Sequence, residues 1–127
     1  MKQHGKKISR NAVWTLPAIS DYQHVYQATL VAPSIPAIEK HKGKVTGGDI
    51  SADGQFLILR TYARTAYLWR LPKSQTLRET LVIAPKEITL ADEKGAEAIC
   101  FGLDGSGLFT VYDGKRKNRP LHVYPRK

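Results

Sequence analysis

Three polar residues that could contact a ligand lie on or beside segments that have the composition of β-strands. Thr46 and Asp49 fall within the segment Val45–Ser51, and Glu97 falls within Ala96–Phe101. Polar groups on strands also hydrogen-bond neighbouring backbone or solvent, which is the more common situation. A structural role for Thr46, Asp49 and Glu97 is therefore the alternative to any role in binding.

A second candidate group is basic and aromatic. Arg60 and Tyr62 follow an apolar run, and Arg64 and Tyr67 come shortly after them. Such a cluster could contact an anionic ligand. Long arginine stems more often cover the apolar surface of a hairpin, and we favour that interpretation.

Motifs for metal binding, phosphate binding and catalysis are absent from the sequence. His4, His24, His41 and His122 do not have the spacing of metal ligands. Residues 102–107 are rich in glycine, but no helix follows that could present its N-terminus to a phosphate. There is no nucleophile elbow, metalloprotease helix or cysteine–histidine pairing. The sequence predicts no metal, no cofactor and no catalytic residue, which favours a non-enzymatic role and leaves catalysis open.

The net charge of +9 is concentrated at the two ends of the chain. Ten of the 20 basic residues lie in residues 1–12 and 114–127, whereas all 11 acidic residues lie between these segments. Nucleic-acid binding is not favoured, because aromatic stacking residues are not interleaved with the basic ones. We interpret the ends as solvated basic segments, with residues 1–11 forming an N-terminal tail.

The expected compartment follows from what the sequence lacks. It has no apolar run long enough to cross a membrane and no secretory signal. Its single cysteine, Cys100, cannot form an internal disulfide and is expected to be a small buried apolar side chain. The cytoplasm is the default location, with a periplasmic or secreted location as the alternative if upstream sequence is missing.

The elements that must position these residues belong to an internal repeat. An offset of 51 residues aligns Thr29–Val31 with Thr80–Val82 and, without a gap, the Asp53-Gly54 pair with Asp104-Gly105. Residues 13–17, VWTLP, match residues 68–72, LWRLP, at an offset of 55. Asp53 and Asp104 are expected to cap tight turns, in which Gly54 and Gly105 adopt positive φ.

Each repeat is predicted to be a set of short antiparallel strands. In the first complete repeat these are Val45–Ser51, Phe56–Leu59, Ala66–Trp69 and an outer strand near Thr80–Ile83 that Glu87–Leu90 extends. In the second they are Ala96–Phe101, Leu108–Tyr112 and Leu121–Tyr124. No segment has clear helical periodicity, although Ile88–Ala98 could contain a turn of helix. The predicted class is all-β.

Residues 45–54, VTGGDISADG, resemble the inner-strand and turn motif of WD40-like and TolB-like β-propeller repeats. Ala52 stands where those repeats usually have proline. Residues 95–105 resemble the related motif of uncharacterised and phytase-esterase-like bacterial propellers. The resemblance implies a partial β-propeller over residues 12–125, with the end of one blade in 12–38, a complete blade in 45–90 and an incomplete last blade in 96–125. A small open β-sandwich is the alternative, and it gives no reason for a fixed offset.

The resemblance also implies a function. In such propellers ligands bind at the mouth of the central channel, which first strands line, so the resemblance makes Thr46, Asp49 and Glu97 candidate ligand-binding residues. The residue that matches Glu97 lies near that channel. Because two and a half blades leave faces and edges uncovered, a protein partner or further copies of the chain are expected to complete the assembly. The expected function is a non-catalytic binding or protein-interaction module. The alternative is a fragment of a propeller hydrolase with a site near Glu97.

Overall fold

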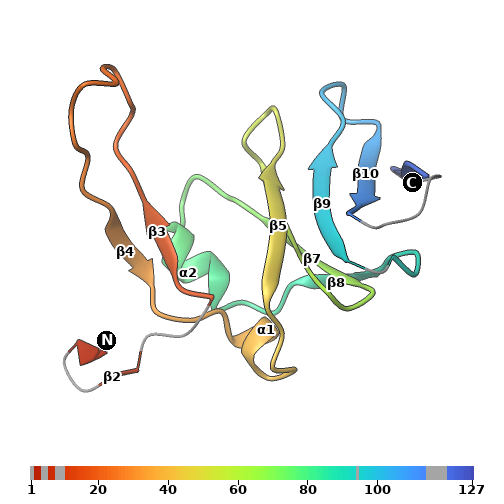
Figure 1. The fold of residues 1–127 in the computed structure, drawn as a ribbon, viewed down its shortest axis with the longest axis horizontal. Helices are drawn as coiled ribbons and strands as arrows, with labels where there is room; N and C mark the ends of the chain where they lie inside the picture. Colours follow the sequence, from red (N-terminus) through yellow and green to blue (C-terminus); the bar gives the residue numbers. More distant parts are fainter. Residues whose placement is uncertain (1, 4–5, 8–10, 94, 114–119) are drawn as a thin grey trace.

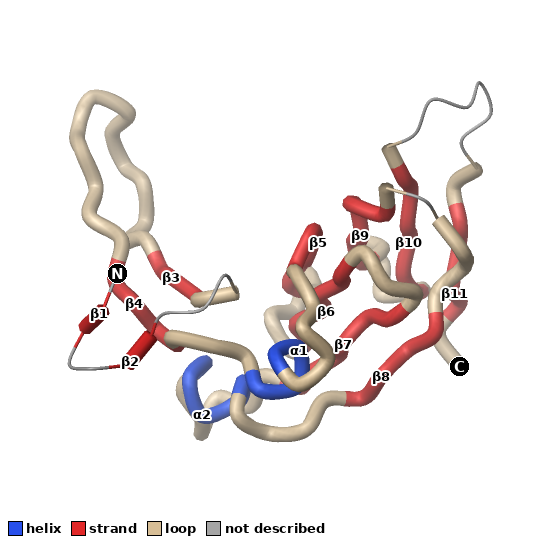
Figure 2. Tube along the Cα trace, turned by 60° about the horizontal axis from the view of Figure 1, so that its bottom comes forward, coloured by secondary structure: helices blue, strands red, loops and turns tan. Residues whose placement is uncertain are grey.

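The chain folds into antiparallel sheets arranged in a row. The computed structural model describes residues 2–3, 6–7, 11–93, 95–113 and 120–127. Within these residues the strands form sheets of two, two, four and three strands, all of them open. Figures 1 and 2 show β3 and β4 at one end of the row, β5 to β8 in the middle and β9 to β11 at the other end. The predicted all-β class is confirmed.

The middle sheet has four strands in sequence order: β5 (Val45–Ile50), β6 (Phe56–Thr61), β7 (Thr65–Arg70) and β8 (Lys86–Thr89). Its central strand β6 carries an unbroken apolar run, Phe56 to Leu59, in which Leu57 and Ile58 are both buried. Consecutive side chains on a strand point to opposite faces, so both faces of this sheet are covered. The prediction of a strand over Phe56–Leu59 is confirmed.

The last sheet repeats the same order with three strands. It consists of β9 (Ala96–Phe101), β10 (Gly107–Tyr112) and β11 (His122–Pro125), with β10 in the centre. The basic segment Lys115–Arg119, between β10 and β11, lies outside the described residues. As predicted, residues 45–90 form a four-stranded antiparallel sheet and residues 96–124 a three-stranded one.

The turn between β5 and β6 and the turn between β9 and β10 are equivalent, residue for residue, at the 51-residue offset. Asp53 Oδ1 accepts a hydrogen bond from the Gln55 amide, and Asp104 Oδ1 accepts one from the Ser106 amide. Gly54 and Gly105 have φ values of 71° and 73°, a region that suits glycine. The predicted turn-capping role of both aspartates is confirmed.

The first sheet pairs β3 (Val13–Thr15) with β4 (Thr29–Ala32), and a long loop between them projects away from the body (Figure 1). Upstream, β1 (Lys2–Gln3) pairs with β2 (Lys6–Lys7), within the segment predicted as a tail. Two short helices, α1 (Pro36–Glu39) and α2 (Leu77–Leu81), complete the described elements.

The predicted outer strand over Thr80–Ile83 is wrong. Thr80 and Leu81 end helix α2, and the outer strand is β8 alone. The helix begins at a cap in which the Thr76 side chain accepts a hydrogen bond from the Glu79 amide, the T-x-x-E pattern of a capping box. The match between Thr29–Val31 and Thr80–Val82 therefore pairs a strand with a helix and is not a structural equivalence. The turn of helix allowed within Ile88–Ala98 is also absent from the described part of that segment, which contains β8 and β9.

Two apolar clusters hold the row of sheets together. One lies between the first and middle sheets and collects buried residues from β4, both helices, β6 and β7: Ala32, Ile35, Ile38, Leu57, Tyr67, Trp69 and Leu81. The other lies between the middle and last sheets and contains Ile58, Ala66, Leu90, Ile99 and Leu108. The middle sheet is thus the shared wall of both cores.

Trp69 and Trp14 provide a matched test of this arrangement, because they occupy the same place in the VWTLP and LWRLP motifs. Trp69 is 3% exposed and its indole N–H donates to the Ile83 carbonyl at 2.9 Å, whereas Trp14 is 45% exposed. We expect Trp69→Ala to lower the free energy of unfolding by about 3–5 kcal/mol. Trp14→Ala is expected to lower it by less than about 1 kcal/mol, because half of that side chain is already in water. Equal losses for the two variants in urea denaturation would contradict the placement of Trp69 in the core.

Candidate functional site

Two of the predicted binding residues are used to join neighbouring strands. The first strand of the middle sheet, β5, lies beside the first strand of the last sheet, β9. The Thr46 hydroxyl donates to the Ala96 carbonyl at 2.7 Å, and Asp49 Oδ2 accepts a hydrogen bond from the Phe101 amide at 2.9 Å. For Thr46 and Asp49 the structural alternative therefore holds, since each is bonded to backbone of the adjacent sheet.

We call the contact between β5 and β9 the seam, and this contact requires glycine at position 47. A Cβ atom added to Gly47 would lie 2.2 Å from the Glu97 carbonyl oxygen, far inside van der Waals contact. The equivalent position in the last sheet, 51 residues later, is Ala98, which is exposed. The glycine thus allows β5 and β9 to approach closely.

Glu97 and Tyr62 are the two predicted site residues that the fold brings together at the surface. The Tyr62 hydroxyl lies 3.4 Å from Glu97 Oε1, and both side chains are exposed. They lie near the end of β9 at which the Thr46 hydroxyl bonds the Ala96 carbonyl, with Tyr62 on the turn after β6 and Glu97 on β9. The pair provides a carboxylate and a phenol that a ligand could reach.

Cys100, which was expected to be buried, is exposed on β9. Its neighbour Ile99 is buried against the middle sheet. Because side chains alternate along a strand, Cys100 must point away from that core. The expectation was wrong because β9 is covered on only one of its faces.

Arg60 is not a surface ligand-binding residue. Its side chain is completely buried between the middle and last sheets, where Nη1 donates to Glu93 Oε1 at 2.8 Å and to the Ala98 carbonyl at 3.0 Å. The basic and aromatic residues that the sequence analysis grouped together also lie in different places. Arg64 Nε donates to the Leu90 carbonyl, while Tyr67 is buried on the opposite face of the sheet.

Glu93, which the sequence did not single out, is the centre of this buried network. Its second oxygen, Oε2, accepts a hydrogen bond from the Thr110 hydroxyl at 3.1 Å and lies 2.6 Å from Nδ1 of His122. It therefore links the middle sheet to two strands of the last sheet. No local signal marks Glu93, because it lies in the short connection between β8 and β9 and its partners are distant in sequence.

The electrostatics of Glu93 follow from these contacts. Burial by itself would raise the pKa of Glu93, but hydrogen bonds from Arg60, His122 and Thr110 outweigh it and hold the pKa below its usual value. Two nitrogens of the Arg60 guanidinium, Nε and Nη2, are buried without a hydrogen-bond partner among the described residues. The carboxylate thus neutralises a charge that is otherwise only partly satisfied.

The turn aspartates are ionised more readily than usual for a local reason. The Ser51 hydroxyl and the Gln55 amide lower the pKa of Asp53, and hydrogen bonding from Ser106 lowers that of Asp104. Both carboxylates are hydrogen-bonded within their own turns.

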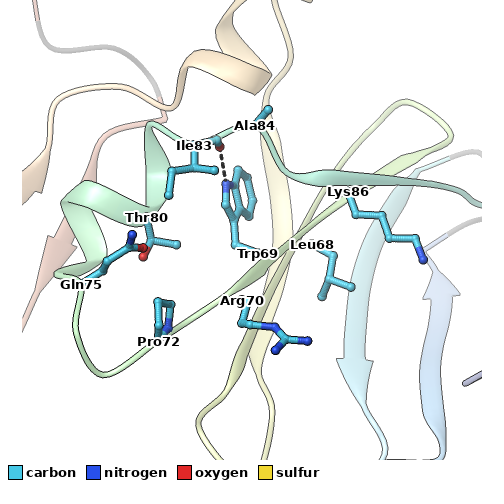
Figure 3. A pocket seen from close by; sticks show the side chains of 9 residues that line it. All are labelled: Leu68, Trp69, Arg70, Pro72, Gln75, Thr80, Ile83, Ala84 and Lys86. Atoms are coloured by element: carbon cyan, nitrogen blue, oxygen red, sulfur yellow. Dashed lines mark hydrogen bonds between the residues drawn. The ribbon is translucent and has the colours of Figure 1, made fainter.

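A cavity of about 310 Å³ lies between β7, helix α2 and the segment that leads to β8. Figure 3 shows Trp69 on its wall, held by the indole hydrogen bond to Ile83, with Pro72 and Gln75 opposite. Arg70 and Lys86 are the charged residues of the lining, and the lining contains no carboxylate. None of the predicted site residues lines this cavity.

The described residues provide few other features of a binding centre. No three His, Cys, Asp or Glu side chains among them are grouped closely enough to hold a metal ion. None of the helices in this part of the chain is long and apolar enough to cross a membrane. No protein-family model matches the chain, and no curated protein is significantly similar to it.

The close approach of β5 and β9 can be tested by adding one methyl group. We expect Gly47→Ala to lower the free energy of unfolding by about 1–3 kcal/mol, because the new Cβ must push the Glu97 carbonyl away. The reverse change at the equivalent position, Ala98→Gly, should cost less than about 1 kcal/mol, the usual effect of a glycine in a strand. If the two variants denature at the same urea concentration, the seam is looser than the structure indicates.

The buried network predicts a pH-dependent stability. The folded-state pKa of Glu93 lies below its unfolded value of about 4.3, so its contribution is complete above that pH and is lost as pH falls through the folded pKa. We expect Glu93→Gln to lower the free energy of unfolding by about 3 kcal/mol at pH 7, because the buried Arg60 charge loses its counter-ion. The difference from wild type should shrink as pH falls below about 4.

The matched control for Glu93 is Glu97→Gln, on an exposed carboxylate of the adjoining strand. It should change the free energy of unfolding by less than about 0.5 kcal/mol at either pH. A Glu93→Gln effect that is equally small at pH 7 would contradict the buried ion pair.

Proposed function

We propose that the chain is a non-catalytic protein-interaction module built from propeller blades, and that it binds another polypeptide along the free edge of its last sheet. The observation that carries the proposal is the position of β11. It pairs with β10 on one side and has no neighbouring strand on the other among the described residues. Such an edge presents unpaired N–H and C=O groups to which a further strand can add.

The register of β10 and β11 identifies which backbone N–H and C=O groups of β11 face away from β10. The Arg126 amide donates to the Ser106 carbonyl at 2.8 Å, just beyond the pairing of Gly107 with Pro125. Hydrogen-bonded pairs alternate with non-bonded pairs in an antiparallel ladder. The N–H and C=O of Val123 therefore point outward, and Pro125, with no N–H, limits the edge at its end.

The side chains along this edge support one specific contact rather than unlimited pairing. Leu121 and Val123 are 60% and 53% exposed, which gives an added strand apolar surface to cover. Arg126, which follows β11, is held with its guanidinium 5.8 Å from the Phe56 ring centre. A cation at the end of an edge strand discourages indefinite sheet growth.

The alternative function, a fragment of a propeller hydrolase, rests on Glu97 and its contact with Tyr62. A single exposed carboxylate beside a phenol can take part in acid–base chemistry, but it needs further groups to activate a substrate. Thr46, Asp49 and Arg60 are engaged in joining the sheets. The interaction module is therefore the function that we propose.

The open edge makes a prediction for amide hydrogen exchange. In dilute, monomeric protein the Val123 amide should exchange quickly, whereas the adjacent Tyr124 amide, which faces β10, should exchange slowly. Raising the concentration of the chain should slow exchange at Val123 if another copy adds to the edge. Slow exchange at Val123 in protein shown by sedimentation to be monomeric would contradict the proposal.

Two substitutions separate the backbone of this edge from its side chain. Val123→Pro removes the outward N–H, and Val123→Thr keeps both the N–H and the β-branched shape. We expect the proline variant to bind an added strand about tenfold more weakly, equivalent to roughly 1.4 kcal/mol, and the threonine variant to bind almost normally.

A further inference from the structure

Among the described residues, the row of sheets ends in two apolar faces that no further sheet covers. At one end, Phe109, Val111 and Val123 point away from the middle sheet, and Val111 and Val123 are 37% and 53% exposed. At the other end Trp14 and Leu16 are 45% and 55% exposed. We infer that these faces are two halves of one interface, through which a second copy of the chain docks head to tail. This inference rests on the proposed interaction function and adds a second copy of the chain as a partner, which meets the sheet faces rather than the edge of β11.

The internal repeat shows what covers the first of these faces. At the 51-residue offset Phe109 corresponds to Ile58, and its cross-strand partner Val123 corresponds to Leu68. Ile58 is completely buried and Leu68 is half-buried, both beneath the last sheet. The face that is open on the last sheet is therefore covered, on the middle sheet, by the next sheet along the chain.

The repeat also identifies the covering face. Trp14 corresponds to Trp69 at the 55-residue offset, and Trp69 lies on the face of the middle sheet turned toward the first sheet. Val13, next to Trp14, packs against the core between the first and middle sheets. The register shifts between Val13 and Trp14, and Trp14, which is 45% exposed and does not belong to that core, is paired with Leu30. We therefore place Trp14 and Leu30 on the outer face of the first sheet. A second copy can thus present to the last sheet the same kind of face that the last sheet presents to the middle one.

Three differences in sequence determine how the copies meet. Ala98 replaces Gly47, Cys100 replaces Asp49 and Val111 replaces Arg60. The alanine methyl prevents the close approach seen between β5 and β9, and neither the aspartate bond nor the buried ion pair can form again. The contact between copies is therefore apolar, centred on β10 and β11, and weaker than the contact within the chain.

Charge opposes this contact and provides an independent measurement. Each copy carries a net charge of +9, so two copies repel each other at low ionic strength. Salt screens that repulsion without weakening apolar burial. Association should therefore strengthen as salt is raised from about 0.05 to 0.5 M, the opposite of an interface held by ion pairs.

The experiment uses two variants of the full chain, one at each end. Trp14→Glu blocks the first face and Val111→Glu blocks the last, and both positions are exposed enough to accept a carboxylate. By sedimentation velocity, each variant alone should self-associate at least about tenfold more weakly than wild type. Because a head-to-tail interface joins different faces, a mixture of the two should form a heterodimer from the intact last sheet of Trp14→Glu and the intact first sheet of Val111→Glu.

The matched control is Tyr22→Glu, which places the same charge on an apolar side chain that is 97% exposed in the loop between β3 and β4. It should associate like wild type, and an equal loss of association would overturn the inference. A wild type that associates while the mixture does not form a heterodimer would overturn head-to-tail docking and leave the interaction module standing. A wild type that remains monomeric at every concentration and salt would also overturn docking by a second copy, whereas the free-edge proposal depends on exchange at Val123.

Discussion

The contact between Arg60 and Glu93 determines how the middle and last sheets fit together. Two apolar sheet faces can pack in several registers, since apolar burial has no direction. A fully buried guanidinium must meet its carboxylate, because an unpaired charge in this core would cost several kcal/mol. The carboxylate in turn engages Thr110 and His122 on the next sheet. The pair thus contributes specificity more than net stability, because its own desolvation offsets much of its attraction.

The seam between β5 and β9 depends on the same alignment of the middle and last sheets. The Thr46 and Asp49 hydrogen bonds reach backbone groups of β9 only if the two first strands lie side by side at the distance that Gly47 permits. The interface between the middle and last sheets is therefore fixed at two separate points. One is formed by Thr46 and Asp49 on β5, and the other is the buried ion pair of Arg60 and Glu93. The apolar cluster that contains Ile58 and Ile99 packs in the same interface.

Much of the fold could be predicted from the sequence, because it repeats. The 51-residue offset located the Asp-Gly turns and the strands beside them, and each of these is determined by a local pattern. The same offset gave a wrong prediction at Thr80. The sequence Thr-Leu-Val lies in a strand at Thr29 but at the end of a helix at Thr80, because the helix cap formed by Thr76 and Glu79 has no counterpart near Thr29. The buried role of Arg60 could not be predicted, because it depends on a glutamate 33 residues away in an irregular connection. Trp14 and Trp69 share a motif but differ in exposure, since only one of them has a neighbouring sheet on its face.

That last difference bears on the proposed interaction role, which concerns the two ends of the row of sheets. Within the row each sheet face has a neighbour, and three of the polar candidates, Thr46, Asp49 and Arg60, are engaged in joining the sheets. Among the described residues, the outer edge of β11 and the outer faces of the first and last sheets have no neighbouring sheet. A repeat can be stabilised by its neighbours only on the sides where neighbours exist. In the proposed interaction, apolar burial and backbone hydrogen bonding, which hold the middle sheet in place, would act between the ends of the row and a partner.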